Sequence, residues 1–328
     1  MSAVAELPAG APRSGLLLSR YAECIFWLGR YMERIENLAR ILDVTETFAR
    51  EGRDDRNWLS VVQINADEER FLAAHKRATA RAVVEFYVLE RANPTSIASA
   101  IEVARENART LRPLISTEMW SQINVFHGWV RQLKADDISP SRLSRLCARL
   151  KESCQTHSGI TEGTFFRDQG WSFYVMGKML ERADQTTRLV DIKYHTLLPS
   201  PQAVGSPLDE GQWSAVLRAA AGYHAFRRSH PRGMAPASVI GFLLLNQAFP
   251  RSLALSVRQI EFHLGQMRSQ FGLRGGPGAL EKLDDLRGEL FSHPIEQVIA
   301  AGLHEFLDWV QRQLIDVHGE IAGSFWAG

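Results

Sequence analysis

Apolar side chains recur at helical spacing through almost the whole chain. From Leu28 to Leu42 they fall three or four residues apart, which places them on one face of a helix that turns 100° per residue. No segment shows the sustained alternation of apolar and polar residues that is typical of a strand. The pattern therefore predicts an all-α fold.

Caps and helix breakers predict where several helices begin. Proline or serine near positions 93, 140 and 294 starts helices that we expect to run to about 112, 154 and 319. Prolines and glycines break the chain near 198–207 and 275–278. The residues from Thr161 to Thr164 are expected to form a loop.

The polar face of one helix is repeated later in the chain. Segment 29–43 returns as 177–191, at an offset of 148 residues, and a second segment, 86–98, returns as 242–254. Such offsets predict a helical bundle of two duplicated halves related by an approximate twofold axis. We expect a disordered lead-in at 1–16 and one helical domain at 17–328, with half one at about 17–160 and half two at about 161–328.

The repeat keeps charged residues and lets the apolar ones vary, which is the reverse of an ordinary packing repeat. The positions kept are Gly29/Gly177, Glu33/Glu181, Arg34/Arg182, Glu36/Asp184, Arg40/Arg188 and Asp43/Asp191. A glycine inside a helix costs about 1 kcal/mol relative to alanine, so close approach of a backbone or a ligand is expected there.

Three interpretations of this charged stripe remain open. It is a solvated face with i,i+4 ion pairs, a buried salt-bridge network that fixes how the halves dock, or a polar binding site. In the last case Glu36, Arg40, Asp43, Asp184, Arg188 and Asp191 are candidate substrate-binding residues. Arg105 and Arg109 form a separate basic ridge that could hold a carboxylate or phosphate.

Composition excludes several classes of function. The 328 residues include 38 basic and 37 acidic ones, a balance that gives no reason to expect nucleic acid or an anionic membrane surface. The longest apolar run is far shorter than the roughly 20 residues of a membrane helix. Three cysteines without metal or redox spacing favour reduced thiols and a cytoplasmic location.

A metal site is a weaker alternative. Glu33 with Glu36, and Glu181 with Asp184, present carboxylates at i,i+3, and oxygen ligands of this kind would suit Mg²⁺ or Mn²⁺. However, no histidine lies on either stripe, and Arg40 would repel a cation. We therefore predict neither a metal nor a cofactor.

Several motifs occur in the order found in one known family. They are 26–30 before Glu33-Arg34, the turn at 93–97, Glu118-Met119-Trp120, Gly170-Trp171-Ser172-Phe173 before Glu181-Arg182, and Phe249-Pro250-Arg251-Ser252. From about Ser19 to the last helix, the chain resembles the bacterial alpha-E family, an all-helical domain with a Glu-Arg motif. In this resemblance Glu33, Arg34, Glu181 and Arg182 occupy the motif itself, which makes them the candidate catalytic residues.

The resemblance also implies a context. Alpha-E proteins are found alongside circularly permuted ATP-grasp proteins and transglutaminase-like proteins, and are thought to take part in forming or processing amide or peptide bonds. The first hypothesis is an accessory partner that presents a substrate or docks the ligase. The second is an enzyme that uses Glu33 or Glu181, with its pKa raised by burial, as general acid or base and arginines to bind a carboxylate. The third is an inert scaffold.

Overall fold

A computed structural model describes residues 17–52, 56–195, 206–231 and 233–327. Every regular element within these ranges is an α-helix, which confirms the predicted all-α class. The expected lead-in at 1–16 lies outside the described residues.

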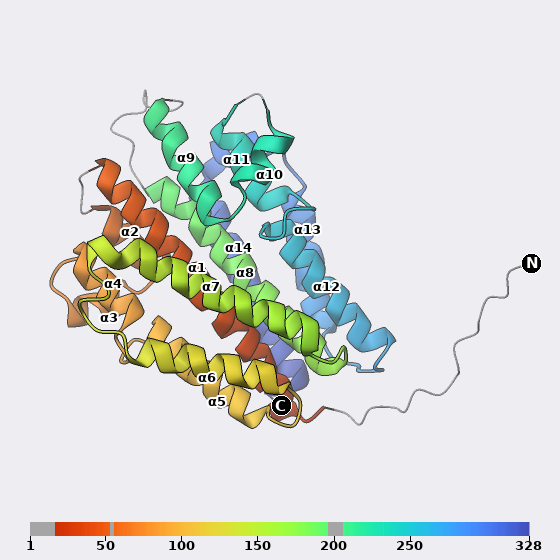
Figure 1. Ribbon diagram of the computed structural model, residues 1–328. Helices are drawn as coiled ribbons and strands as arrows, with labels where there is room; N and C mark the ends of the chain where they lie inside the picture. The colour runs from red at the N-terminus through yellow and green to blue at the C-terminus, as the bar shows by residue number, and fades with distance from the viewer. Residues whose placement is uncertain (1–16, 53–55, 196–205, 232, 328) are drawn as a thin grey trace, which may run out of the picture.

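The helices fall into two runs (Figure 1). The first run contains α1 (Ser19–Gly52), α2 (Arg56–Ile64), α3 (Glu68–Ala74), α4 (Ala80–Val88), α5 (Ile97–Thr110), α6 (Thr117–Arg131) and α7 (Pro140–Thr164). The second run contains α8 (Gln169–His195), α9 (Pro207–Ala219), α10 (Tyr223–Ser229), α11 (Pro236–Leu245), α12 (Leu253–Ser269), α13 (Pro277–Leu290) and α14 (Ile295–Phe325).

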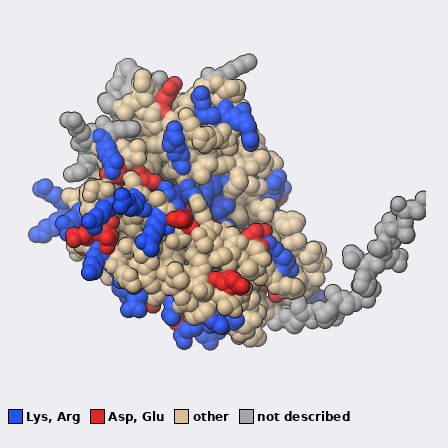
Figure 2. Space-filling model, viewed as in Figure 1, with Lys and Arg blue, Asp and Glu red and all other residues tan. Residues whose placement is uncertain are grey.

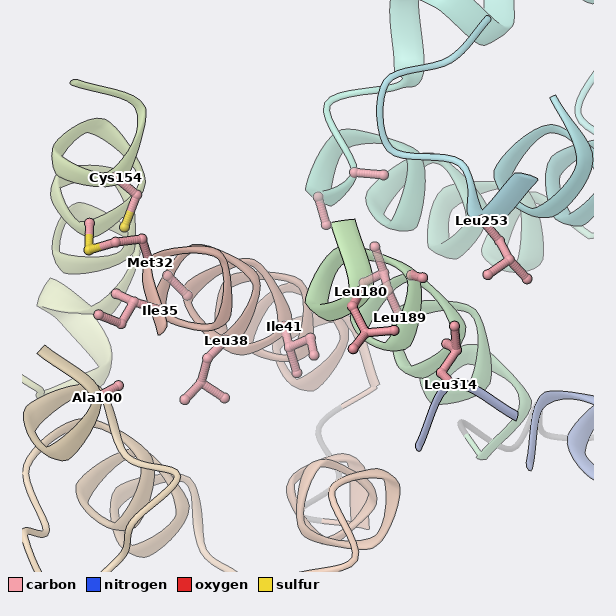
Figure 3. Packing of buried hydrophobic residues seen from close by; sticks show 14 of the residues in the cluster. Met32, Ile35, Leu38, Ile41, Ala100, Cys154, Leu180, Leu189, Leu253 and Leu314 are labelled. Atoms are coloured by element: carbon pink, nitrogen blue, oxygen red, sulfur yellow. The ribbon is translucent and has the colours of Figure 1, made fainter. Parts of the chain in front are cut away.

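The long helices α1 and α8 pack against each other at the centre of the molecule. Helices α5 and α7 cover α1, and α12 and α14 cover α8 in the same way. Figure 3 shows part of this arrangement: Met32 of α1 lies beside Cys154 of α7, and Leu253 of α12 lies at the opposite side of the α1–α8 pair. These apolar side chains are buried and belong to one continuous core.

Two glycines explain why α1 and α8 approach so closely. A Cβ atom added at Gly29 would collide with the carbonyl oxygen of Tyr174, and one added at Gly177 would collide with the carbonyl of Phe26. Each glycine thus faces the backbone of the opposite helix. The expectation of close approach at both repeated glycines is confirmed, and the neighbour is a backbone.

The two runs match helix by helix in order. A matched detail follows the second helix of each run: Ala66 after α2 and Ala221 after α9 both adopt a left-handed conformation, with φ of 53° and 56°. The twofold relation of the halves stays an inference, which these paired features support.

Two helices are longer than predicted. Helix α7 ends at Thr164 and α14 at Phe325, so residues 161–164, which we expected in a loop, are helical. The buried positions of α7 continue at helical spacing through Cys154, His157 and Thr161, so one buried face extends along the helix to this segment. The expected boundary of the halves at about 160 therefore falls inside α7.

Candidate functional site

The Glu-Arg motif of each copy forms an ion pair with the motif of the other copy. Arg182 of α8 donates to Glu33 of α1 through two hydrogen bonds, Nε to Oε1 at 2.8 Å and Nη2 to Oε2 at 2.7 Å. In return, Arg34 of α1 donates to Glu181 of α8, Nε to Oε1 at 2.6 Å and Nη2 to Oε2 at 2.9 Å. The two bidentate pairs cross the α1–α8 interface in opposite directions.

Each glutamate also binds a second arginine. Arg30, one turn before Arg34, donates to Glu181 Oε2 at 2.9 Å. Glu33 accepts a hydrogen bond from Nη1 of Arg251 at 2.9 Å. Arg251 is the residue before the N-cap of α12. Both carboxylates have a side-chain exposure of 1 %, so they are closed off from solvent.

Arg251 extends the pairing along α1. Its Nη2 donates to Glu36 Oε1, which also accepts from Nη2 of Arg40 at 2.5 Å. The five side chains of Glu33, Glu36, Arg40, Arg182 and Arg251 form what we call the first cluster. Glu181 with Arg30 and Arg34 forms the second cluster.

The last arginine of each stripe reaches into the opposite half. Arg40 Nη1 donates to the carbonyl oxygen of Ala219 at the end of α9, and Arg188 Nη1 donates to that of Ile64 at the end of α2. These are carbonyls of final turns, where a cation interacts favourably with the negative end of the helix dipole. Asp184 holds Arg188 through a 2.8 Å hydrogen bond to Nε.

The ionisation of the two glutamates is set by their arginines. Burial opposes the charged form of Glu181, but the charges of Arg34 and Arg30 outweigh it and lower the pKa to about 2. Burial likewise opposes ionisation of Glu33, yet Arg182 and Arg251 hold the pKa of this carboxyl below its usual range. We expected burial to raise these pKa values; that expectation is wrong because each carboxylate has two arginine partners.

Besides Asp184 and Arg188, two more predicted stripe residues lie outside the clusters. Asp43 pairs with Lys151 of α7 at 2.7 Å, and its repeat Asp191 accepts a hydrogen bond from His304 Nδ1 of α14 at 3.0 Å. These carboxylates join the central helices to the long closing helix of each run.

Arg105 and Arg109 lie away from the contact between α1 and α8, which we call the seam. Arg105 donates to Asn124 of α6 and lies over the ring of Trp120, and Arg109 pairs with Glu106 of its own helix. The structure therefore does not bring this basic ridge together with the other candidate residues.

Sequence reasoning missed Arg30 and Arg251 as members of the clusters. Arg30 was within reach, since it is repeated in kind as Lys178 in the motif. Arg251 replaces a threonine, Thr95, at the matching helix start of the first half. The sequence signal that could have identified Arg251 was a charged residue present in only one copy of the repeat.

Arginines engage the carboxylates of both stripes. The four stripe carboxylates Glu33, Glu36, Glu181 and Asp184 all contact arginines. Among the described residues, no group of three or more histidine, cysteine or acidic side chains is placed to hold a metal ion. No helix in the described ranges is long and apolar enough to cross a membrane.

Comparison with known proteins places this chain in a family. Residues 17–326 match the alpha-E family, described as a predicted alpha-helical domain with a conserved ER motif. The chain belongs to this family.

The similar curated proteins are uncharacterized. One from Mycobacterium bovis and two from Mycobacterium tuberculosis strains are each 25% identical over 323 residues, which cover 89% of this chain. The chain spans 35% of the length of these relatives, about a third. No solved structure matches it significantly.

Proposed function

We propose that this protein is an accessory partner of an ATP-grasp-type amide or peptide ligase, and that it presents a substrate or docks the ligase through its helical surface. The observation that supports this role is that the Glu-Arg motif is consumed in buried ion pairs. Its residues hold α1 and α8 together and leave the outer helices available for other molecules.

The same observation weakens the alternative in which the chain is an enzyme using its motif. A general acid must carry a proton near the working pH, and a carboxyl with a pKa of about 2, such as Glu181, is ionised there. A general base must reach its substrate, whereas Glu33 is enclosed by Arg182 and Arg251. An inert scaffold is the remaining alternative.

The experiment combines co-purification with an activity assay. The tagged chain is expressed together with a circularly permuted ATP-grasp protein and a transglutaminase-like protein, the two proposed partners, and complexes are isolated. ATP-dependent ligation is then measured with and without the chain. Stimulation of the ligase supports the accessory role, and turnover by the purified chain alone would establish the enzyme alternative. If the chain neither associates with the ligase nor stimulates it, the inert scaffold is the remaining hypothesis.

A matched variant separates the motif from the surface. Glu33→Gln should lower stability and reduce stimulation only in proportion to the unfolded fraction. Abolished stimulation in a variant that is still fully folded would contradict a purely structural role for the motif.

A further inference from the structure

The two copies of the motif differ in the residue after the repeated glycine. Arg30 of the first copy binds Glu181 Oε2 at 2.9 Å. Its counterpart Lys178 forms no ion pair with a carboxylate of a described residue, and its Nζ donates to Ser158 Oγ of α7 at 2.6 Å. The second arginine bound to Glu33 is instead Arg251, from the start of α12.

Lys178 lines a pocket of about 520 Å³ between α7, α8 and α12. Pockets of this size hold small molecules. The lining combines Lys178 and Ser158 with the ring of Trp171, the imidazole of His263 and the amides of Gln259 and Gln266. The half-exposed ring of Phe262 also borders it.

The first copy fills the equivalent space with larger side chains. At the offset of 148 residues, Val175 and Met179 of the pocket lining correspond to Trp27 and Tyr31. The rings of Trp27 and Tyr31 stack at 5.3 Å, and His318 of α14 packs edge-on against Trp27. Replacing two aromatic residues by Val175 and Met179 leaves room beside α8.

The charges near Lys178 favour an anion. The first cluster has two carboxylates, Glu33 and Glu36, against the guanidinium groups of Arg40, Arg182 and Arg251. Lys178 adds another cation, and burial together with the charge of Arg182 lowers the pKa of its amine. A bound carboxylate would offset this excess of positive charge.

Other charged groups of the lining are already engaged. Glu162 pairs with Arg167 at 2.6 Å, and Asp168 accepts the backbone N–H of Gly170 at 2.8 Å. Figure 2 shows basic and acidic side chains interspersed over one face of the molecule, so a local cation inside a pocket is a more specific signal than surface charge.

We propose that this pocket binds a small molecule that carries a carboxylate and a peptide-like amide, in the size range of a short peptide or an acylated amino acid. Lys178 Nζ and the Ser158 hydroxyl hold the carboxylate. The side-chain amides of Gln259 and Gln266, which both donate and accept hydrogen bonds, match the amide group. The assignment deepens the proposed function, on which its biological meaning rests, by giving the presented substrate a chemical class and a site.

Calorimetry on the full chain tests the pocket with two matched probes. N-acetyl-L-glutamine carries the carboxylate, and N-acetyl-L-glutaminamide replaces it by a neutral amide. The acid should bind at least tenfold more tightly than the amide. Equal affinity for both probes, or no binding of the acid at millimolar concentration, would overturn the proposal.

Variants locate the binding. Lys178→Gln should weaken binding of the acid at least tenfold, whereas Lys282→Gln, which removes an exposed lysine of α13, should not change it. Met179→Tyr restores the larger residue of the first copy and should block the pocket. Circular dichroism identifies any variant that fails to fold. Undiminished binding to folded Lys178→Gln and Met179→Tyr proteins would place the ligand elsewhere.

The outcome is independent of the ligase. If calorimetry shows specific binding but no ligase associates, the accessory role fails and the pocket stands. If the ligase associates and neither probe binds, the pocket assignment fails and the partnership stands.

Discussion

Glu33 and Glu181 occupy equivalent positions in the repeated motif but have different surroundings. Glu181 binds two arginines of one helix, Arg30 and Arg34. Glu33 binds arginines from two helices, Arg182 of α8 and Arg251 at the start of α12. The first cluster therefore ties three elements together, whereas the second ties two.

The difference extends to the residue that follows each repeated glycine. Glu33 has Arg182 and Arg251 as its hydrogen-bonded arginine partners. Lys178 contacts Ser158 and borders a pocket, while Arg30 forms an ion pair with Glu181. Both copies retain the cross-helix Glu-Arg pair.

The largest expected effect is that of removing one glutamate charge. Glu33→Gln leaves Arg182 without its carboxylate partner and Arg251 with Glu36 alone, and breaking a buried pair costs about 3–5 kcal/mol. Glu181→Gln should cost less, because Arg30 and Arg34 are somewhat more exposed, at 13 % and 19 %. Urea unfolding measures both variants. Equal losses of unfolding free energy in the two variants would mean that the bond from Glu33 to Arg251 of the α12 start adds no stability.

Acid should weaken the second cluster in a defined pH range. The pKa of Glu181 is about 2 in the folded protein against an ordinary value of 4.5, so its contribution to stability is complete above about pH 4.5. That contribution declines as the pH falls from 4.5 toward 2, because the unfolded chain then binds a proton more readily. Glu181→Gln should show a smaller decline over this range than the native chain. If stability falls with pH in parallel for the variant and the native chain, the ion pairs of Glu181 are not the source of the decline.

Overpacking at the helix contact should have the next largest effect. Gly177→Ala directs a methyl group at the carbonyl of Phe26, and such overpacking costs about 1–3 kcal/mol. Gly29→Ala should behave alike, since Tyr174 stands in the same relation to it. Gly159→Ala in α7 meets no atom within 4 Å and serves as a control that should be stabilising. Thermal melts that rise for Gly177→Ala would contradict the close contact.

A double-mutant cycle distinguishes the clusters. Arg40 and Arg251 share Glu36 Oε1, so their alanine substitutions should couple by about 0.5–3 kcal/mol. Arg40 and Arg188 share no carboxylate in the described structure, and their cycle should close within about 0.5 kcal/mol. Strong coupling of Arg40 with Arg188 would instead merge the two stripes into one network.

The smallest effect concerns the turns after α2 and α9. Ala66 and Ala221 have positive φ, which glycine adopts without the steric cost of a Cβ atom. Ala66→Gly and Ala221→Gly should each stabilise the protein by up to about 1 kcal/mol in chemical unfolding. A loss of stability in only one of the two glycine variants would show that the two turns are not equivalent.

The sequence was sufficient to predict the helical class and the charged seam. The repeat of charged residues at fixed spacing identified Glu33, Arg34, Glu181 and Arg182, because residues at the same spacing in two helices lie on the same face of each helix. Whether these residues act on a substrate stays a prediction.

What the sequence could not predict depends on contacts between distant segments. Arg251 reaches Glu33 from 218 positions away, and Ser158, which lies outside the repeat, meets Lys178 only where α7 crosses α8. Asp43 and Asp191 share the spacing of the stripe but point to α7 and α14. Helical periodicity gives the face of a residue and not the partner that covers it.

The reciprocal Glu-Arg exchange has a consequence for how such a molecule could arise. A single half that carries both a Glu33-like and an Arg34-like residue beside a small glycine surface is complementary to a second copy of itself. Two identical chains could associate through the same contacts that α1 and α8 make here, with each glutamate bound by the other chain's arginine. The contact of α1 with α8 thus resembles the interface of a symmetric homodimer, and Arg251 and Lys178 are two positions at which the two sides differ.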